Sequence, residues 1–427
     1  MRGSYVAVVR EQAARVTFRI VASLTSPSAT AAWIQPLMWA RRLARLHARS
    51  YGKDGYNILV VRLDGIGDVV MTGPFLRELR RAYPAANITL VVGPHVANLV
   101  EACPHVDRVL TFRLPPANRW WRPLSRRLTA LLFARRHLWP ASYDLAMVPR
   151  WGKDSYEAKV LTYLSGAPSR AGYSERSSAR AQTQDPGYDR FLTNVVNDRS
   201  IKHEVQRNLE LLSELGVEAS DDILEVWLSD EDQSVANEVL ASRGPEPLVA
   251  LALGAGDPRR IWPVERFAEV GRWLTDRGMG LVVVGGPGEE ALGEALRMRL
   301  PGRISGRIIE LTNKATLRQT AAVLSHCSLF CGNDAGPMHL AAAVGIPVVE
   351  ISCHSLCGDD LHANSPKRFG PWRVPNRIVR PEQPSDACVA GCGVPMPHCI
   401  LNVQVDSVIA AIESLEERDC CLGRLGR

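Results

Sequence analysis

The stretch Cys331-Gly332-Asn333-Asp334-Ala335-Gly336-Pro337-Met338-His339, continued by Leu340-Ala341-Ala342-Ala343-Val344-Gly345-Ile346-Pro347, decides the fold. An apolar strand end at 328–331 leads into it, and its first two glycines let the backbone turn sharply. Pro337 suits the first helical position, whereas Gly345 and Pro347 end the helix before a new strand at 348–351. A strand, a tight loop and a helix in this order are typical of a parallel α/β sheet.

The start of this helix is a candidate binding site. Free N–H groups and the helix dipole favour an anion where a helix begins at the carboxyl edge of a parallel sheet. Asp334 lies just before the helix, and its carboxylate is a poor phosphate ligand but a good acceptor for sugar hydroxyls. The combination suggests a nucleotide-sugar pocket. On this stretch alone, an ordinary turn with a solvated Asp334 is an equally good interpretation.

Length and composition limit the class of protein. A chain of 427 residues predicts two domains with appendages, and 46% hydrophobic with 22% charged residues is typical of a soluble globular protein. No apolar run is long enough to span a bilayer, and charges within the first apolar stretches argue against a secretory signal. Ten cysteines in such a chain indicate reduced thiols in the cytoplasm rather than a disulfide scaffold.

The first half contains repeated strand, loop and helix units. Apolar strands predicted at 57–63, 88–92, 109–112 and 143–148 alternate with helical stretches, which favours a parallel sheet covered on both faces. The loop after the first strand, Asp64-Gly65-Ile66-Gly67-Asp68, lacks the glycine spacing of a dinucleotide fingerprint. Asp68 is either a helix cap or a base at the sheet edge, and the pattern alone favours the cap.

Two basic segments are candidates for contact with an anionic partner. An anionic lipid-linked acceptor fits the first, and a solvated helix face is its alternative. Nucleic acid fits it by charge only, because no base-reading module is present. The second, 33–46, suits a basic amphipathic helix on a membrane surface, but we favour a packed helix or a frayed tail. The first segment contains Arg113, Arg119, Trp120, Trp121, Arg122, Arg126, Arg127, Arg135, Arg136 and Trp139.

The second half repeats the same unit after a Gly/Pro linker at 243–247. A polar loop is predicted from Arg170 to Asp189, with helices at about 203–216 and 230–242 before the linker. Strands at 248–253 and 280–284 are each followed by a Gly-rich loop, at 254–263 and 285–290. Such loops at one sheet edge form a nucleotide crevice.

The last segment is rich in thiols. The spacing Cys388-x3-Cys392-x6-Cys399 is not that of a standard zinc ribbon, so reduced structural thiols are favoured over a metal site. Cys353, Cys357 and His398 lie in the same region, and a final helix is predicted at about 405–418.

Four motifs in register resemble glycosyltransferase family 9, the ADP-heptose:lipopolysaccharide heptosyltransferases. They occur in the family's order across about 57–418. The resemblance does not include the N-terminal extension. The motifs are Ile58–Val70 with Thr72 and Pro74, the 254–263 loop ahead of Glu265-Arg266-Phe267, Gly285-Gly286-Pro287-Gly288-Glu289, and Gly332–Ala342.

The resemblance implies a GT-B fold, an α/β architecture with two Rossmann-like domains facing across a cleft. The expected parts are an N-terminal extension (1–55), an acceptor domain (56–245), a nucleotide-sugar domain (246–400), and a C-terminal helix returning to the first domain with a tail (401–427). The implied enzyme is inverting and needs neither a catalytic metal nor a cofactor.

The resemblance also implies roles for individual residues. Asp68 matches the family's base, and this favours the catalytic interpretation over the cap. Arg260 occupies the place of a common Lys and would stabilise the leaving diphosphate. Substrate-binding roles are implied for Gly67, Gly256, Glu289 (on the ribose), Asp334 (on the sugar), Gly336, Pro337, Met338 and His339, with Arg122 and Arg126 for the anionic acceptor.

The expected partners are a nucleotide-sugar donor, an anionic lipid-linked saccharide acceptor and, through a peripheral contact, the cytoplasmic face of the inner membrane; no nucleic acid is expected. Two alternatives stay open. One is a protein or other glycan heptosyltransferase with a Cys-bound metal, because some members of the resembled family carry Cys-bound iron. The other is a non-catalytic nucleotide-sugar-binding assembly factor, suggested by Arg260 in place of Lys and by a 254–263 loop without hydroxyl side chains at 255 and 256.

Overall fold

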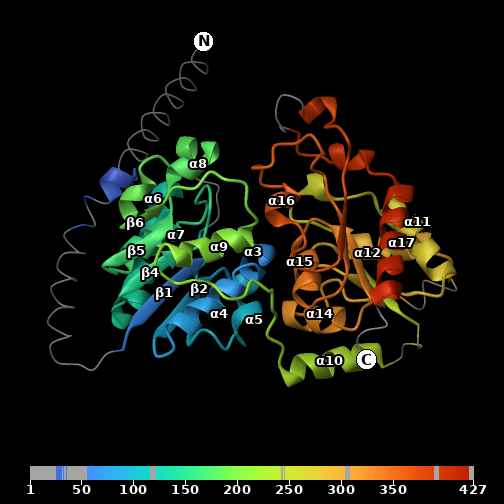
Figure 1. The fold of residues 1–427 in the computed structure, drawn as a ribbon, viewed down its shortest axis with the longest axis horizontal. Helices are drawn as coiled ribbons and strands as arrows, with labels where there is room; N and C mark the ends of the chain where they lie inside the picture. Colours follow the sequence, from blue (N-terminus) through green and yellow to red (C-terminus); the bar gives the residue numbers. More distant parts are fainter. Residues whose placement is uncertain are drawn as a thin grey trace, which may run out of the picture.

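The computed structural model describes residues 26–30, 32, 35, 55–115, 122–241, 244, 246–302, 308–388 and 394–422. They form two halves that lie side by side, each built on one sheet of six parallel strands (Figure 1). The strand orders are β3-β2-β1-β4-β5-β6 and β12-β11-β10-β7-β8-β9. Each order reverses at one point, between β1 and β4 and between β7 and β10, which is where open α/β sheets bind ligands. The predicted pair of Rossmann-like domains is confirmed.

The central strands are almost wholly apolar because helices cover both faces of each sheet. In the first half, Val60 pairs with Leu90 on one side and with Met147 on the other. The first-half strands are β1 (Asn57–Arg62), β2 (Asn87–Val92), β3 (Arg108–Thr111), β4 (Leu145–Val148), β5 (Ser169–Tyr173) and β6 (Asn194–Val196). The second-half strands are β7 (Leu248–Ala252), β8 (Gly280–Val284), β9 (Ile309–Glu310), β10 (Leu329–Asn333), β11 (Val348–Ile351) and β12 (Asn376–Val379).

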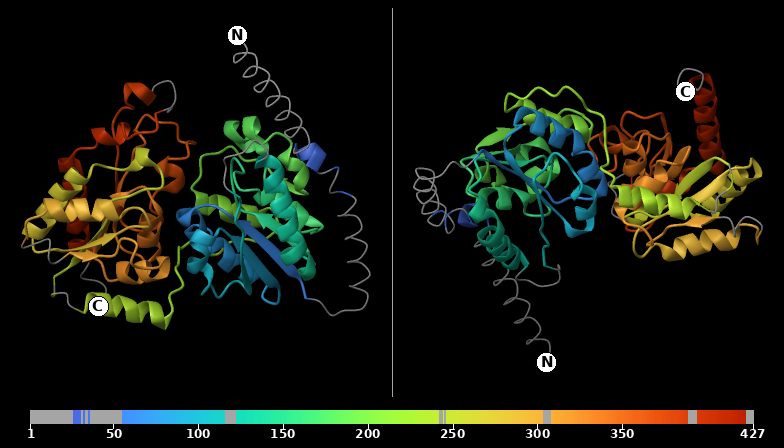
Figure 2. Two further views of the ribbon diagram at one scale, coloured as in Figure 1. Left: turned by 180° about the vertical axis from the view of Figure 1, so that it is seen from behind. Right: turned by 90° about the horizontal axis from the view of Figure 1, so that it is seen from below.

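The helices flank these sheets, as two further views show (Figure 2). In the first half they are α3 (Ile66–Val70), α4 (Gly73–Ala82), α5 (Ala97–Val100), α6 (Arg122–Phe133), α7 (Ala158–Leu164), α8 (Ala179–Gln184) and α9 (Glu204–Ser213). Later in the chain come α10 (Asp230–Leu240), α11 (Val264–Asp276), α12 (Glu290–Arg299), α14 (Leu317–Leu324), α15 (Gly336–Ala343), α16 (Pro366–Phe369) and α17 (Val405–Leu422).

One apolar core runs through both halves. Its buried side chains include Val69 and Leu99 from the first half and Leu324 and Met338 from the second. Two smaller cores fill the outer faces of the two sheets. Burial of this shared surface fixes α3 of the first half against α15 of the second.

Two helices pack differently from the prediction. The described part of α17 lies on the outer flank of the second half (Figure 1) and buries Val408, Ile412 and Leu415 in that half's core. It therefore does not return to the first domain, because its apolar face covers the second sheet. α10 packs on α14, with a 2.8 Å ion pair between Asp232 and Arg318. The chain thus reaches the second half before residue 230, earlier than the expected boundary at 245.

Two local predictions are also corrected. The segment predicted as a polar loop from Arg170 begins inside strand β5, whose residues 171–173 are buried. β5 is paired with β4 on one side and with β6 on the other, so this polar and glycine-containing segment is held in the sheet by its backbone. The helical stretch expected between the first two strands consists of two helices, α3 and α4, separated by Met71 and Thr72.

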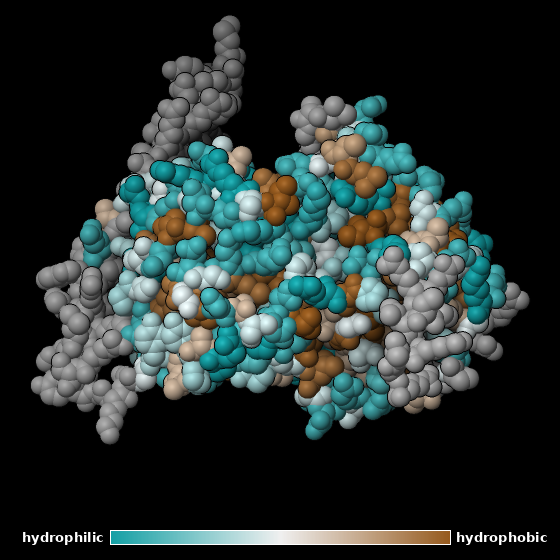
Figure 3. All heavy atoms as spheres, viewed as in Figure 1, coloured by the Kyte–Doolittle hydropathy of each residue, from teal (hydrophilic) through white to brown (hydrophobic). Residues whose placement is uncertain are grey.

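The face seen in Figure 3 is mostly hydrophilic, with hydrophobic residues gathered in scattered patches. Among the described helices, none combines the length and the apolar composition that crossing a bilayer requires. The basic segments fall partly outside the described residues: most of 33–46, and Arg119, Trp120 and Trp121.

Candidate active site

A cavity of about 810 Å³ lies between the two halves. The first half contributes the loop and helix after β1 and the segment after β4. The second half contributes the loop after β7, the start of α15 and the segment 359–363. Loops at the carboxyl ends of two parallel sheets therefore face each other across one space, as the crevice rule for such sheets predicts.

Asp68 lies on α3 and lines this cavity. Its carboxylate accepts hydrogen bonds from the Gly65 N–H at 3.2 Å and from Arg62 Nη2 at 2.8 Å. Asp68 thus helps to cap α3, as one interpretation of the sequence predicts, but 27% of its side chain stays exposed. A carboxylate that is held in place and still open to the cavity can accept a proton from a bound hydroxyl.

A buried ion-pair network holds the arginine that contacts Asp68. Arg62 is almost fully buried on the last position of β1 and contacts Asp64 through Nε at 3.2 Å. Arg150, which follows β4, pairs with the same Asp64 carboxylate. The network joins two neighbouring strands and fixes the guanidinium that orients Asp68.

The opposite wall carries Arg260 and Asp334. Arg260 Nη1 lies 3.3 Å from Asp334 Oδ2, and Arg260 Nη2 donates to Asn364 Oδ1 at 2.7 Å. Asp334 is buried, and burial raises the pKa of its carboxyl; Arg260 opposes this shift and Asp68 adds to it. The influence of Asp68 shows that the two carboxyl groups share one electrostatic environment. Asn364 was not predicted, because nothing in the sequence around 364 marks it.

The start of α15 also reaches the cavity. Ala335 precedes the helix, and Ala335, Gly336 and His339 line the cavity wall. The first N–H groups of a helix lack intrahelical partners and carry a partial positive charge. Pro337 is not among the lining residues, and Met338 is fully buried in the shared core. Their side chains therefore support the helix rather than contact a ligand.

The two walls approach most closely where α3 meets α15. A β-carbon on Gly67 would overlap the imidazole of His339, and one on Gly336 would come within 2.8 Å of Ile66. Only glycine at both positions allows this approach. Burial lowers the pKa of His339 to about 3, with smaller contributions from His203 and Arg260, so the imidazole is neutral.

Two other predicted residues lie on loops of the second half. Gly256 lines the cavity, and a β-carbon there would meet no atom within 4 Å. Glu289 is partly buried between the β7 and β8 loops and accepts a 2.9 Å hydrogen bond from the Gly286 N–H. Glu290 is exposed and bonds Asn313. Glu289 is the better placed of the two, although it is not one of the residues lining the cavity.

Arg126, one of the two predicted acceptor arginines, does not line the cavity. Arg126 pairs with Glu157 at 3.4 Å and donates to the carbonyl of Ser155. The side chain of Arg122 lies outside the described residues. Besides Arg62, the cationic side chains on the wall contributed by the first half are Lys153, Arg180 and Arg150, the last of which is paired with Asp64. Arg150 and Lys153 directly follow strand β4, and that position at the carboxyl edge is the signal that could have identified them.

A family model and the curated relatives point to the same family. A family model described as glycosyltransferase family 9 (heptosyltransferase) matches residues 133–392. Lipooligosaccharide heptosyltransferase 2 of Haemophilus influenzae is 24% identical over 310 residues, which are 69% of this chain and 82% of the relative.

Two solved structures share the fold. The glycosyl transferase family 9 protein of Veillonella parvula superposes with a TM-score of 0.69 at 23% identity, covering 86% of this chain and 99% of that one. The Escherichia coli ADP-heptose lps heptosyltransferase II gives a TM-score of 0.63 at 20% identity, covering 85% and 99%. These similarities confirm the GT-B architecture.

Proposed function

Because this chain belongs to glycosyltransferase family 9 and is a glycosyltransferase, we propose that it transfers a heptose from ADP-heptose to an anionic lipopolysaccharide core acceptor. The observation that carries the proposal is the position of Asp68 on one wall of the cavity and of Arg260 with the start of α15 on the other. With a base on one wall and a diphosphate site on the other, an acceptor hydroxyl can displace the diphosphate from a sugar carbon that lies between them.

The donor binds to the second half. Its diphosphate lies at the start of α15, where the N–H groups and Arg260 supply positive charge. On binding, Arg260 exchanges part of its contact with Asp334 for the phosphate oxygens. Asp334 is then free to accept hydrogen bonds from the heptose hydroxyls, and Glu289 from the ribose.

The reaction is a single inverting displacement. The acceptor hydroxyl attacks the anomeric carbon from the face opposite the diphosphate, and Asp68 takes the hydroxyl proton. The new C–O bond forms as the bond to the ADP oxygen breaks. Negative charge then grows on the departing diphosphate, and Arg260 and the α15 dipole stabilise it without reorganising.

The acceptor enters along the first half. Lys153 and Arg180 line that side of the cavity and suit phosphate or carboxylate groups of a core saccharide, whereas Arg150 is paired with Asp64. An acceptor anchored by its lipid in the inner membrane would present its saccharide to an enzyme that approaches from the cytoplasm. We therefore place the enzyme at the cytoplasmic face of the inner membrane.

An acceptor panel tests the proposal. The purified protein is incubated with ADP-heptose and with three acceptors: core lipopolysaccharide, the same core without lipid, and a Ser/Thr-rich peptide. Mass spectrometry is expected to show one added heptose on both core acceptors and none on the peptide. Transfer to the peptide alone would replace the proposal with a protein heptosyltransferase, and no transfer to any acceptor would contradict the proposed reaction.

A further inference from the structure

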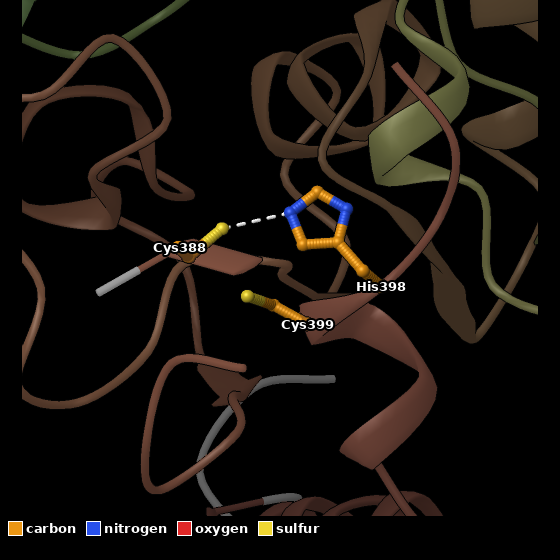
Figure 4. Close-up of side chains that lie close together, drawn as sticks. All are labelled: Cys388, His398 and Cys399. Carbon is orange, nitrogen blue, oxygen red and sulfur yellow. Dashed lines mark hydrogen bonds between the residues drawn. The ribbon is translucent and has the colours of Figure 1, made fainter. Parts of the chain in front are cut away.

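Three potential metal ligands meet near the end of the second half. Cys388 ends a short 3₁₀ helix at 386–388, and His398 and Cys399 lie at the start of another at 399–402. Cys388 Sγ, a ring nitrogen of His398 and Cys399 Sγ all lie within 4.8 Å of one another. Figure 4 shows the three side chains pointing toward one another from two separate segments.

Hydrogen bonds to the surrounding residues hold these three atoms in orientations that suit metal ligands. His398 Nδ1 lies 2.6 Å from the Met396 carbonyl, which fixes the proton on Nδ1 and turns the Nε2 lone pair toward Cys388 Sγ at 2.8 Å. A backbone carbonyl on the second ring nitrogen is the usual support of a metal-binding His. The Ser385 N–H points to Cys399 Sγ at 3.3 Å and helps to hold this sulfur in place.

We propose that Cys388, His398 and Cys399 bind one zinc ion. Two thiolates and one imidazole are a donor set that zinc prefers over magnesium or calcium. Zinc binding would release the thiol protons of Cys388 and Cys399 to solvent. Cys388 Sγ and His398 Nε2 would then separate to roughly 3.5 Å, as Zn–S and Zn–N bonds of about 2.3 and 2.0 Å require. The spacing along the chain favoured structural thiols; the folded arrangement supports a metal instead.

The proposed metal site lies next to residues 399–403, a segment that packs against the loop carrying Arg260. The three ligands do not line the cavity. The turn that begins at Cys399 packs on the short helix Pro258–Arg260. Trp262 Nε1 donates to the Val403 carbonyl at 3.0 Å, and Arg266 Nη1 to the Leu401 carbonyl at 2.7 Å. The zinc is therefore a positioning element for Arg260 and takes no part in the chemistry.

Metal content tests the proposal without any activity measurement. Full-length protein is purified without chelator, incubated with zinc and desalted, and the metal is counted by inductively coupled plasma mass spectrometry. We expect about one zinc per chain in the wild type. Cys388→Ser, His398→Gln and Cys399→Ser are each expected to lose it. Cys357→Ser is the matched control, because Cys357 is exposed in the same half and lies outside the cluster, and it should keep the zinc.

A second measurement, made on the wild-type protein, tests the proposal even if the variants fail to fold. Wild-type protein stripped by a chelator is titrated with Co²⁺, which should give thiolate-to-metal charge-transfer absorption and saturate at about one equivalent. Zinc should then displace the cobalt and raise the midpoint of thermal unfolding. Wild-type protein that retains no zinc and gives no cobalt spectrum would overturn the proposal. So would Cys388→Ser and Cys399→Ser variants that both keep the full zinc content.

Discussion

Gly67 on α3 lies directly against the imidazole of His339 on α15, with no space for a β-carbon between them. The contact joins the two halves beside the cavity and next to Asp68. The reverse arrangement, Ile66 against Gly336, lies beside it. Two glycines on opposite walls thus set the distance between the proposed base and the proposed diphosphate site.

Gly67→Ala is expected to separate these walls. The added methyl group would overlap His339, which is buried and cannot move freely, and such overpacking costs roughly 1–3 kcal/mol. We expect kcat/KM for heptose transfer to fall at least about tenfold, with a fall in the midpoint of thermal unfolding. Gly65→Ala is the control, since its β-carbon would meet Asp68 at an ordinary 3.6 Å. Equal effects of the two substitutions would contradict the close-approach argument.

Arg260→Ala is expected to weaken donor binding and slow transfer. Charge-assisted hydrogen bonds to phosphate contribute roughly 1.5–3 kcal/mol, so the Kd for ADP should rise about 10- to 150-fold. Isothermal titration with ADP measures this directly. Arg259→Ala is the matched control, because Arg259 is paired with Asp257 through Nε at 3.0 Å and does not line the cavity. An unchanged Kd for Arg260→Ala would remove Arg260 from the proposed site.

The local parts of this site could be predicted from sequence. The turn before α15 and the loop after β1 each lie within about fifteen residues, and glycine, proline and aspartate positions define them. The contacts between these parts could not be predicted. Asn364 reaches Arg260 across 104 positions of the chain, and Gly67 meets His339 only after both sheets have formed.

The packing of α17 was mispredicted for a related reason. Its apolar face predicts that it is covered, but not which sheet covers it. The resemblance suggested the first domain, and the described residues of α17 lie on the second. The prediction for Arg126 was wrong for a different reason: its guanidinium is paired with Glu157, which charge patterns along the chain do not reveal.

Acidification is expected to destabilise the protein through His203, which joins the halves. His203 Nε2 bonds the Gly370 carbonyl at 2.9 Å, Nδ1 accepts from the Val205 N–H, and the ring stacks on Trp372. Burial lowers the pKa of His203 from 6.5 to about 4. The folded state therefore holds fewer protons than the unfolded state between these values. The stability from neutral His203 is complete above pH 6.5 and is lost as pH falls toward 4.

His203→Gln removes this titration while keeping a donor for Gly370. Between about pH 7 and pH 5, the wild type should lose roughly 2 kcal/mol more of its unfolding free energy than the variant does. Urea unfolding at a series of pH values measures the difference. His326→Gln, at an exposed position, should follow the wild-type curve. Parallel curves for wild type and His203→Gln would contradict a neutral, buried His203.

The most direct test of the account is Asp68→Asn, measured for both chemistry and binding. The amide keeps the shape of the side chain but cannot accept the hydroxyl proton, so kcat for heptose transfer should fall roughly 10²- to 10⁴-fold. The Kd for ADP should stay within about twofold, because the diphosphate site lies on the opposite wall. Transfer by Asp68→Asn at the wild-type rate would contradict the central claim that Asp68 is the base facing the donor.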